Sequence, residues 1–171
     1  MSIRDTSPPP PQAQAAEPHT YADRETGALY KDAFEMTNAF LTRFSEHASL
    51  SEVVQLDATG YAQVKRGSAS IGLNVLEDNG VLMLLAPIAT VPPAKGVNRE
   101  AFYRRLLELS FLATADAAFA IDAGKDVVYV RALRRLSGLD YEEFEDLLVT
   151  VGAVADEWDD KLKTEFGVPD V

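Results

Sequence analysis

The order of the hydrophobic periods constrains this chain more than any other feature of its sequence. An apolar period of three to four residues comes first, as in an amphipathic helix, and three short strand-like runs follow it. A second helical period, two more strand-like runs and a last helical period complete the chain. This order, α-β-β-β-α-β-β-α, predicts one small α+β domain that binds other molecules rather than an enzyme.

The first two helical periods have wider apolar arcs than packing on one sheet requires. The first spans residues 28–48, and the second spans residues 98–113 with Asn98 as its predicted N-cap. Each arc covers about 160° at about 100° per residue, whereas one packing face needs little more than about 100°. The surplus predicts exposed apolar surface. Its members are Tyr30, Phe34 and Leu41 beside the core stripe of Leu29, Ala33, Met36, Phe40 and Phe44, and Tyr103 and Leu107 beside Phe102, Leu106, Leu109 and Ala113.

The strand-like runs are separated by turn signals. Residues 81–88 are continuously apolar, which predicts a central strand with both faces covered. The Asn79-Gly80 pair before this run favours a tight hairpin, because it allows positive φ angles. The other predicted strands are 61–65, to which 53–56 is a lead-in, 69–75, 117–121 and 127–133.

The last helical period begins at Asp140, with Glu143 three positions on as in a capping box. Its apolar side chains cover only about 120°, which indicates a single core face. Ten acidic residues and two lysines occupy residues 140–165. Asp156 and Asp160 share a helix face, but no calcium-loop pattern surrounds them, so we predict a solvated acidic face and no metal site.

Composition limits the function further. The net charge of −11 disfavours nucleic-acid binding and anionic membrane surfaces. No cysteine, nucleotide-binding glycine motif or nucleophile motif occurs, so we expect no enzyme activity and no cofactor. No signal-peptide core or run of 18 apolar residues occurs, so we expect no membrane insertion and a cytoplasmic location. Residues 1–25, with Pro8–Pro11, predict a disordered leader before a single domain over 26–168.

The arginines leave two interpretations open. They can balance the acidic last helix, within one protomer or across a dimer, or they can form an anion site. The residues concerned are Arg99, Arg104, Arg105, Arg131, Arg134 and Arg135.

Several stretches resemble a known family. They are Ile71–Val75, Val81–Leu85, Arg105–Leu112, Ala118–Asp122, Val128–Val130 and the last helix through Trp158. Over about residues 28–166 the chain resembles the class I type III secretion chaperones of bacteria, of the Tir-chaperone type, and it is also similar to the related YbjN-like domain.

The resemblance implies a twisted antiparallel sheet flanked by helices, and a homodimer that holds an unfolded client or effector segment along hydrophobic grooves. Combined with the wide arcs, it leads us to expect a dimer contact on the second helix and a client contact on the flank of the first. The expected dimer residues are Phe102, Tyr103, Leu106, Leu107 and Leu109, and the expected client-binding residues are Tyr30, Phe34 and Leu41.

The alternative is a YbjN-like regulatory domain that binds a folded signalling or cytoskeletal partner. Recognition would then lie in Pro8–Pro11 or in the acidic last helix.

Overall fold

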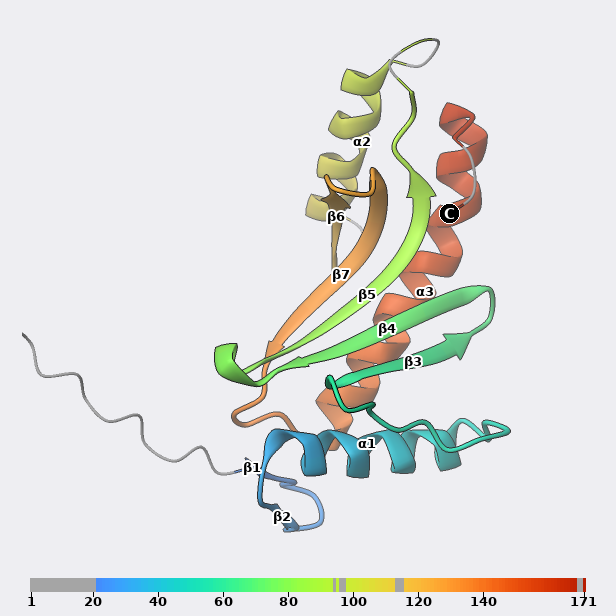
Figure 1. Ribbon diagram of the computed structural model, residues 1–171. Coiled ribbons are helices and arrows are strands. Elements are labelled where there is room, and N and C mark those ends of the chain that lie inside the picture. The colour runs from blue at the N-terminus through green and yellow to red at the C-terminus, as the bar shows by residue number, and fades with distance from the viewer. Residues whose placement is uncertain (1–20, 94, 96–97, 113–115, 169–170) are drawn as a thin grey trace, which may run out of the picture.

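The computed structural model describes residues 21–93, 95, 98–112, 116–168 and 171, and it confirms the predicted α+β fold (Figure 1). Three helices accompany a five-stranded antiparallel sheet in the order β3-β4-β5-β7-β6. The elements are β1 (Tyr21–Ala22), β2 (Leu29–Tyr30), α1 (Ala33–His47), β3 (Tyr61–Arg66), β4 (Ala69–Leu76), the short 3-10 turn η1 (Glu77–Asn79), β5 (Val81–Thr90), α2 (Arg99–Leu112), β6 (Ala118–Asp122), β7 (Val127–Arg135) and α3 (Tyr141–Phe166).

Helix α1 begins five residues later than predicted. The Asp32 side chain accepts a hydrogen bond from the Glu35 N–H at 2.8 Å, which makes Asp32 the N-cap. Tyr30 therefore lies outside the helix and pairs with Tyr21 in a short two-stranded ladder. Residues 21–25, assigned to the leader by the sequence prediction, belong to this ordered segment, whereas residues 1–20 with the four prolines lie outside the described part of the chain.

The lead-in segment 53–56 is not a strand, because side chains of helix α1 accept the hydrogen bonds of its backbone N–H groups. The Val54 N–H donates to Ser45 Oγ at 3.1 Å, and the Leu56 N–H donates to Asn38 Oδ1 at 2.8 Å. These side-chain acceptors replace a strand partner for the two backbone groups. The segment is thereby fixed along α1 (Figure 1).

The predicted caps of the other two helices are confirmed. Asn98 Oδ1 accepts from the Ala101 N–H at 3.1 Å, and Asp140 Oδ1 accepts from the Glu143 N–H at 3.0 Å. Helix α3 ends at Gly167, whose φ of 62° is the left-handed conformation that glycine adopts most readily. The predicted single core face of α3 is also confirmed, because the apolar residues that form it are buried: Phe144, Leu147, Leu148, Val151, Val154, Ala155, Trp158 and Leu162.

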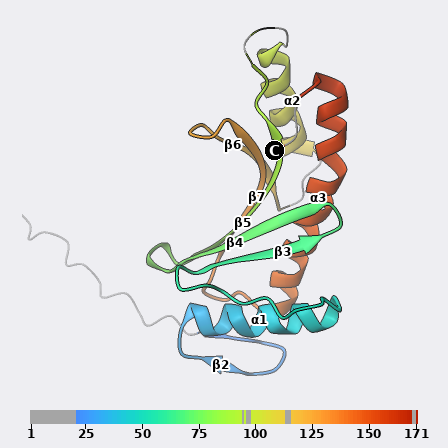
Figure 2. The same ribbon diagram turned by 45° about the vertical axis from the view of Figure 1, so that its right-hand side comes forward.

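Helices α2 and α3 both lie on one side of the sheet, and α1 crosses one end (Figures 1 and 2). Strand β5 is central, as predicted, but the prediction that both of its faces are covered is wrong. Leu82, Leu84 and Ala86 are fully buried toward α3, whereas the alternate residues of β5 are only half-buried. We call the side of the sheet away from α2 and α3 the open face.

Aromatic rings join α1 to α3 at the centre of the core. Phe40 contacts Phe144 at 5.5 Å between ring centroids and Tyr141 at 5.8 Å. All three side chains are at most 1% exposed. Further along α3, a Cβ on Gly152 would lie 3.1 Å from Ile71 Cδ1, so this glycine allows the helix to approach the sheet closely.

Candidate functional site

The outer face of α2 carries an exposed apolar stripe. Tyr103, Leu107 and Phe111 stand four residues apart on one side of the helix and are 36%, 73% and 87% exposed. Ile121 on the neighbouring edge strand β6 is 41% exposed. Together these four residues form what we call the α2 surface. Large apolar side chains clustered in this way are typical of sites that bind another protein.

The inner face of α2 belongs to the core. Phe102, Leu106 and Leu109 are at most 5% exposed, and the Phe102 ring meets Phe166 of α3 edge-on at 5.2 Å. Of the five residues expected at a dimer contact, only Tyr103 and Leu107 are therefore at the surface. Periodicity placed Tyr103 and Leu107 outside the core stripe correctly, but the expected dimer contact also included the three residues of that stripe.

A second apolar surface lies where the first residues of α1 meet the end of β4. Phe34 is half-buried and lines a hollow of about 300 Å³ together with Val75 and Leu76 and the polar residues 77–79. The Phe34 ring packs on Gly60, whose φ is +80° and where a Cβ would lie 3.0 Å from the ring. Phe34 is thus held at the rim of this hollow, which we call the Phe34 hollow.

The other two residues expected to contact a client are placed differently. The Tyr30 ring is half-buried and meets Phe40 edge-on at 5.9 Å, so it covers the core at the base of α1. Leu41 is fully buried. Leu29, expected in the core stripe, is instead 76% exposed, because it lies before the Asp32 cap and not on the helix. Among the three expected client-binding residues, Phe34 is the one that faces a hollow.

The acidic residues of α3 form local pairs. Asp156 accepts hydrogen bonds from the N–H and the hydroxyl of Ser68 in the β3–β4 turn. The bond from the hydroxyl is the main reason why the pKa of Asp156 is lowered. Glu157 pairs with Lys161 at 2.6 Å, and Asp159 pairs with Lys163 at 3.6 Å. Within the described residues no cluster of three acidic or histidine side chains could hold a metal.

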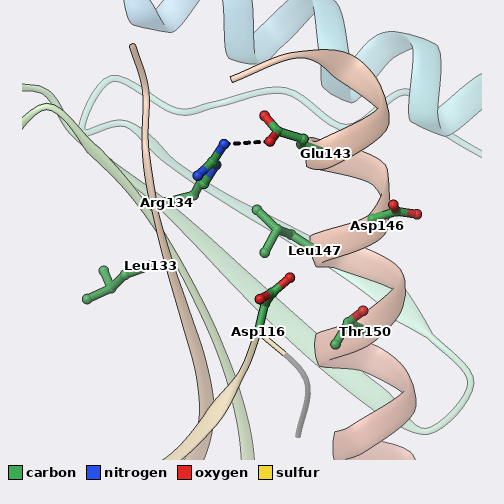
Figure 3. Close-up of a pocket in the computed structure, with 7 residues that line it drawn as sticks. All are labelled: Asp116, Leu133, Arg134, Glu143, Asp146, Leu147 and Thr150. Carbon is green, nitrogen blue, oxygen red and sulfur yellow. Dashed lines mark hydrogen bonds and ion pairs between the residues drawn. The ribbon is translucent and has the colours of Figure 1, made fainter. Parts of the chain in front are cut away.

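A polar hollow of about 260 Å³ lies between β7 and α3 (Figure 3). Arg134 points across the hollow and donates a hydrogen bond to the Glu143 carboxylate. This bond is the main reason why the pKa of Glu143 is lowered. Leu133 points to the opposite side of β7, away from α3 (Figure 3). The ion pair thus joins β7 to the start of α3, while Leu133 belongs to the open face.

Tyr141, at the start of α3, gives the core a titration that can be measured. Burial, followed by the negative charge of Glu145, raises its pKa from 10.0 to about 12. Its hydroxyl contacts His47 Nδ1 at 3.1 Å, and the Arg43 guanidinium lies 3.9 Å from the ring centroid. The folded chain therefore holds the Tyr141 proton more tightly than the unfolded chain does.

We expect the Tyr141 contribution to stability to be complete below about pH 10 and to be lost as the pH rises toward 12. Between these values the unfolded chain releases the proton and the folded chain retains it, so the free energy of unfolding falls by roughly 2–3 kcal/mol. Urea unfolding from pH 9 to 12 measures this loss as the difference between the wild type and Tyr141→Phe. A pH-independent difference would show that burial does not hold the phenol proton.

The family follows from a comparison of the sequence with known protein families. A model of the Tir chaperone protein (CesT) family matches residues 39–159, which run from α1 through the sheet and α2 into α3. The chain belongs to this family. The predicted resemblance to class I type III secretion chaperones is confirmed. No curated protein sequence matches this CesT-family chain significantly.

Solved structures share the fold of this CesT-family chain. A chain in the crystal structure of the ExsC–ExsE complex aligns with a TM-score of 0.61 and 22% identity over 77% of this chain and 96% of that one. A chain of the HopA1–SchA chaperone–effector complex gives 0.56 and 15% over 73% and 97%. A chain of the complex of the Yersinia pestis type III secretion chaperone SycH with a stable fragment of YscM2 gives 0.51 and 13% over 70% and 97%.

Sequence reasoning missed two members of the α2 surface, Phe111 and Ile121. Phe111 is the most exposed of the large apolar side chains of the described residues, yet it was not among the residues expected at a dimer contact. The signal that could have found it is its spacing, because Phe111 stands four residues after Leu107 and eight after Tyr103. No described helix is both long and apolar enough to span a membrane.

Proposed function

We propose that this CesT-family chain is a non-catalytic chaperone of the bacterial cytoplasm that dimerises through the α2 surface and holds a segment of an effector protein. The observation that carries the proposal is the stripe of Tyr103, Leu107 and Phe111, which the described part of the protomer leaves uncovered. The family match supports the chaperone role, and two of the structural neighbours are complexes of a chaperone with another protein.

The α2 surface suits a twofold contact. In a twofold dimer the same patch of both copies meets, so the apolar area buried is twice that of the stripe on one helix. Tyr and Phe at the ends of the stripe and Leu at its centre are side chains of the kind found in the core of protein interfaces. Charged neighbours are already satisfied within the helix, since Arg104 pairs with Glu108 at 2.9 Å.

We place the client segment at the Phe34 hollow. Its apolar wall is formed by Phe34, Val75 and Leu76, and Glu77 and Asp78 lie at its rim. A client side chain that is apolar would enter the hollow, and a basic neighbour would meet the two carboxylates. The hollow is small, so it accepts one or two side chains of a segment that continues beyond it.

Purification of the tagged full-length chain from its native host tests the proposal. We expect a specific secreted effector to co-purify with the wild type and with Val53→Ser, and to be reduced at least tenfold with Phe34→Ser. Val53 is an exposed aliphatic residue beyond the other end of α1, so it is the matched control. Thermal melts of both variants verify that each is folded.

Equal recovery of the effector with Phe34→Ser would contradict a client site at the hollow. Recovery of no effector from a host with an active secretion system would contradict the chaperone role itself.

A further inference from the structure

We propose that the open face of the sheet binds an amphipathic helix whose flank carries carboxylates. This rests on the proposed function, because we assign the helix to the client protein. The surface is distinct from the Phe34 hollow and from the α2 surface, and in Figure 1 it faces the viewer with no described helix in front of it. Three properties support the assignment: an apolar row, two unpaired guanidinium groups, and strands whose backbone groups are already hydrogen-bonded within the sheet.

The apolar row lies on the central strand. Val81, Met83, Leu85 and Pro87 point to the open face and are each half-buried, although no described element lies over them. Leu133 on β7 stands opposite Met83 in the ladder and is 46% exposed. Side chains in register on neighbouring strands are in contact, so these residues form one continuous patch. Such a patch is typical of an interaction site.

Two arginines flank Leu133 on the same face. Arg131 stands opposite Leu85 and Arg135 opposite Val81, and both side chains are exposed. Neither guanidinium forms an ion pair or hydrogen bond with a described residue. By contrast, Arg134, on the other side of β7, is bound to Glu143. On a chain of net charge −11, two unpaired guanidiniums beside apolar residues favour a ligand with carboxylates.

The other charged residues of the ladder leave this preference intact. Lys65 on β3 alternates with the buried Val64 and so adds a third cation on the open face. Asp122, at the far end of β6, pairs with Lys125 at 3.9 Å. The open face around the apolar row is thus cationic, while the outward side of α3 is acidic.

The form of the ligand follows from what a sheet face offers. The backbone N–H and C=O groups of β4, β5 and β7 are used within the ladder, so a bound segment meets side chains only. An extended segment would lose water from its backbone without gaining partners, whereas a helix satisfies its own backbone groups. Arg131 and Arg135 lie about 13 Å apart along β7, and two residues seven positions apart on one helix face lie about 10.5 Å apart, a separation that two long arginine side chains can match. The ligand helix therefore carries carboxylates about two turns apart on one flank of an apolar stripe.

A synthetic peptide tests this inference on the full-length chain. The probe is a fluorescein-labelled helical peptide of about 20 residues with a leucine stripe and two glutamates seven positions apart on one flank of it, and binding is measured by fluorescence anisotropy. We expect the double variant Arg131→Gln, Arg135→Gln to bind it at least about tenfold more weakly than the wild type. A matched peptide with glutamine in place of glutamate should bind the wild type as weakly as the acidic peptide binds the double variant.

Lys31→Gln, which removes an exposed cation before α1 and away from the open face, should bind the acidic peptide as the wild type does. Equal affinity of the double variant and the wild type, or of the two peptides, would overturn the inference. A change of Leu133→Asp that halves the oligomer mass would also overturn it, because the face would then be covered by a second copy. Phe34→Ser should retain peptide binding, so a failure at the Phe34 hollow and a failure at the open face give different results.

Discussion

Leu107→Asp is expected to convert the dimer proposed through α2 into a monomer. The Leu107 side chain is 73% exposed in the protomer and lies at the centre of the α2 surface, so a twofold contact would bury it twice. An aspartate there would bring two unpaired carboxylates into an apolar interface, which raises the dissociation constant at least about a hundredfold. Sedimentation velocity over a range of micromolar concentrations measures the change.

Leu29→Asp is the matched control, because Leu29 is equally exposed but lies before α1 and away from α2. This control should remain dimeric, and both variants should keep the circular dichroism and melting temperature of the wild type. A Leu107→Asp chain that sediments as the wild type does would contradict dimerisation through α2. Leu106 is unsuitable for this test, because its side chain is buried and an aspartate there would disrupt the core.

Phe40→Ala is expected to cause the largest loss of stability of any single substitution considered for this chain. The Phe40 ring is 1% exposed and contacts Tyr30, Tyr141 and Phe144, so its removal leaves a cavity between α1 and α3. Truncation of a buried phenylalanine costs about 3–5 kcal/mol. Equilibrium unfolding in urea measures the loss as a lower midpoint at an unchanged slope.

Phe40→Leu separates the effect of the cavity from that of the aromatic contacts, since leucine refills most of the volume. We expect this variant to lose less than half as much stability as Phe40→Ala. A Phe40→Ala chain within about 1 kcal/mol of the wild type would show that α1 is not part of the cooperative core.

The sequence allowed prediction of the element order because most elements carry local signals. Asn98 and Asp140 are side-chain caps, and the apolar residues of α3 keep one helical face, so α2 and α3 could be located closely. The start of α1 was missed because Leu29 and Tyr30 continue the apolar period beyond the true cap at Asp32. Periodicity alone does not distinguish one more helical turn from a short strand that packs on the same core.

The binding surfaces were less predictable, because exposure depends on tertiary packing. The wide arc of α2 correctly predicted that Leu107 is exposed beside the core stripe, but the extension of the exposed surface to Phe111 and to Ile121 of β6 depends on how α2 packs on its neighbours. The continuous apolar run of β5 predicted burial on both faces. The structure leaves one face open, because both long helices that follow in the sequence pack on the other side of the sheet (Figure 2).

Single-cysteine cross-linking shows whether α2 meets α2 of a second copy. The chain has no cysteine, so Leu107→Cys and Leu29→Cys each introduce one thiol at an exposed position. Each is treated with a short bismaleimide at micromolar protein concentration and analysed on a denaturing gel. A dimer through α2 gives a covalent species of twice 18.7 kDa for Leu107→Cys and almost none for Leu29→Cys. No cross-link at position 107, or equal cross-linking at the two positions, would contradict it.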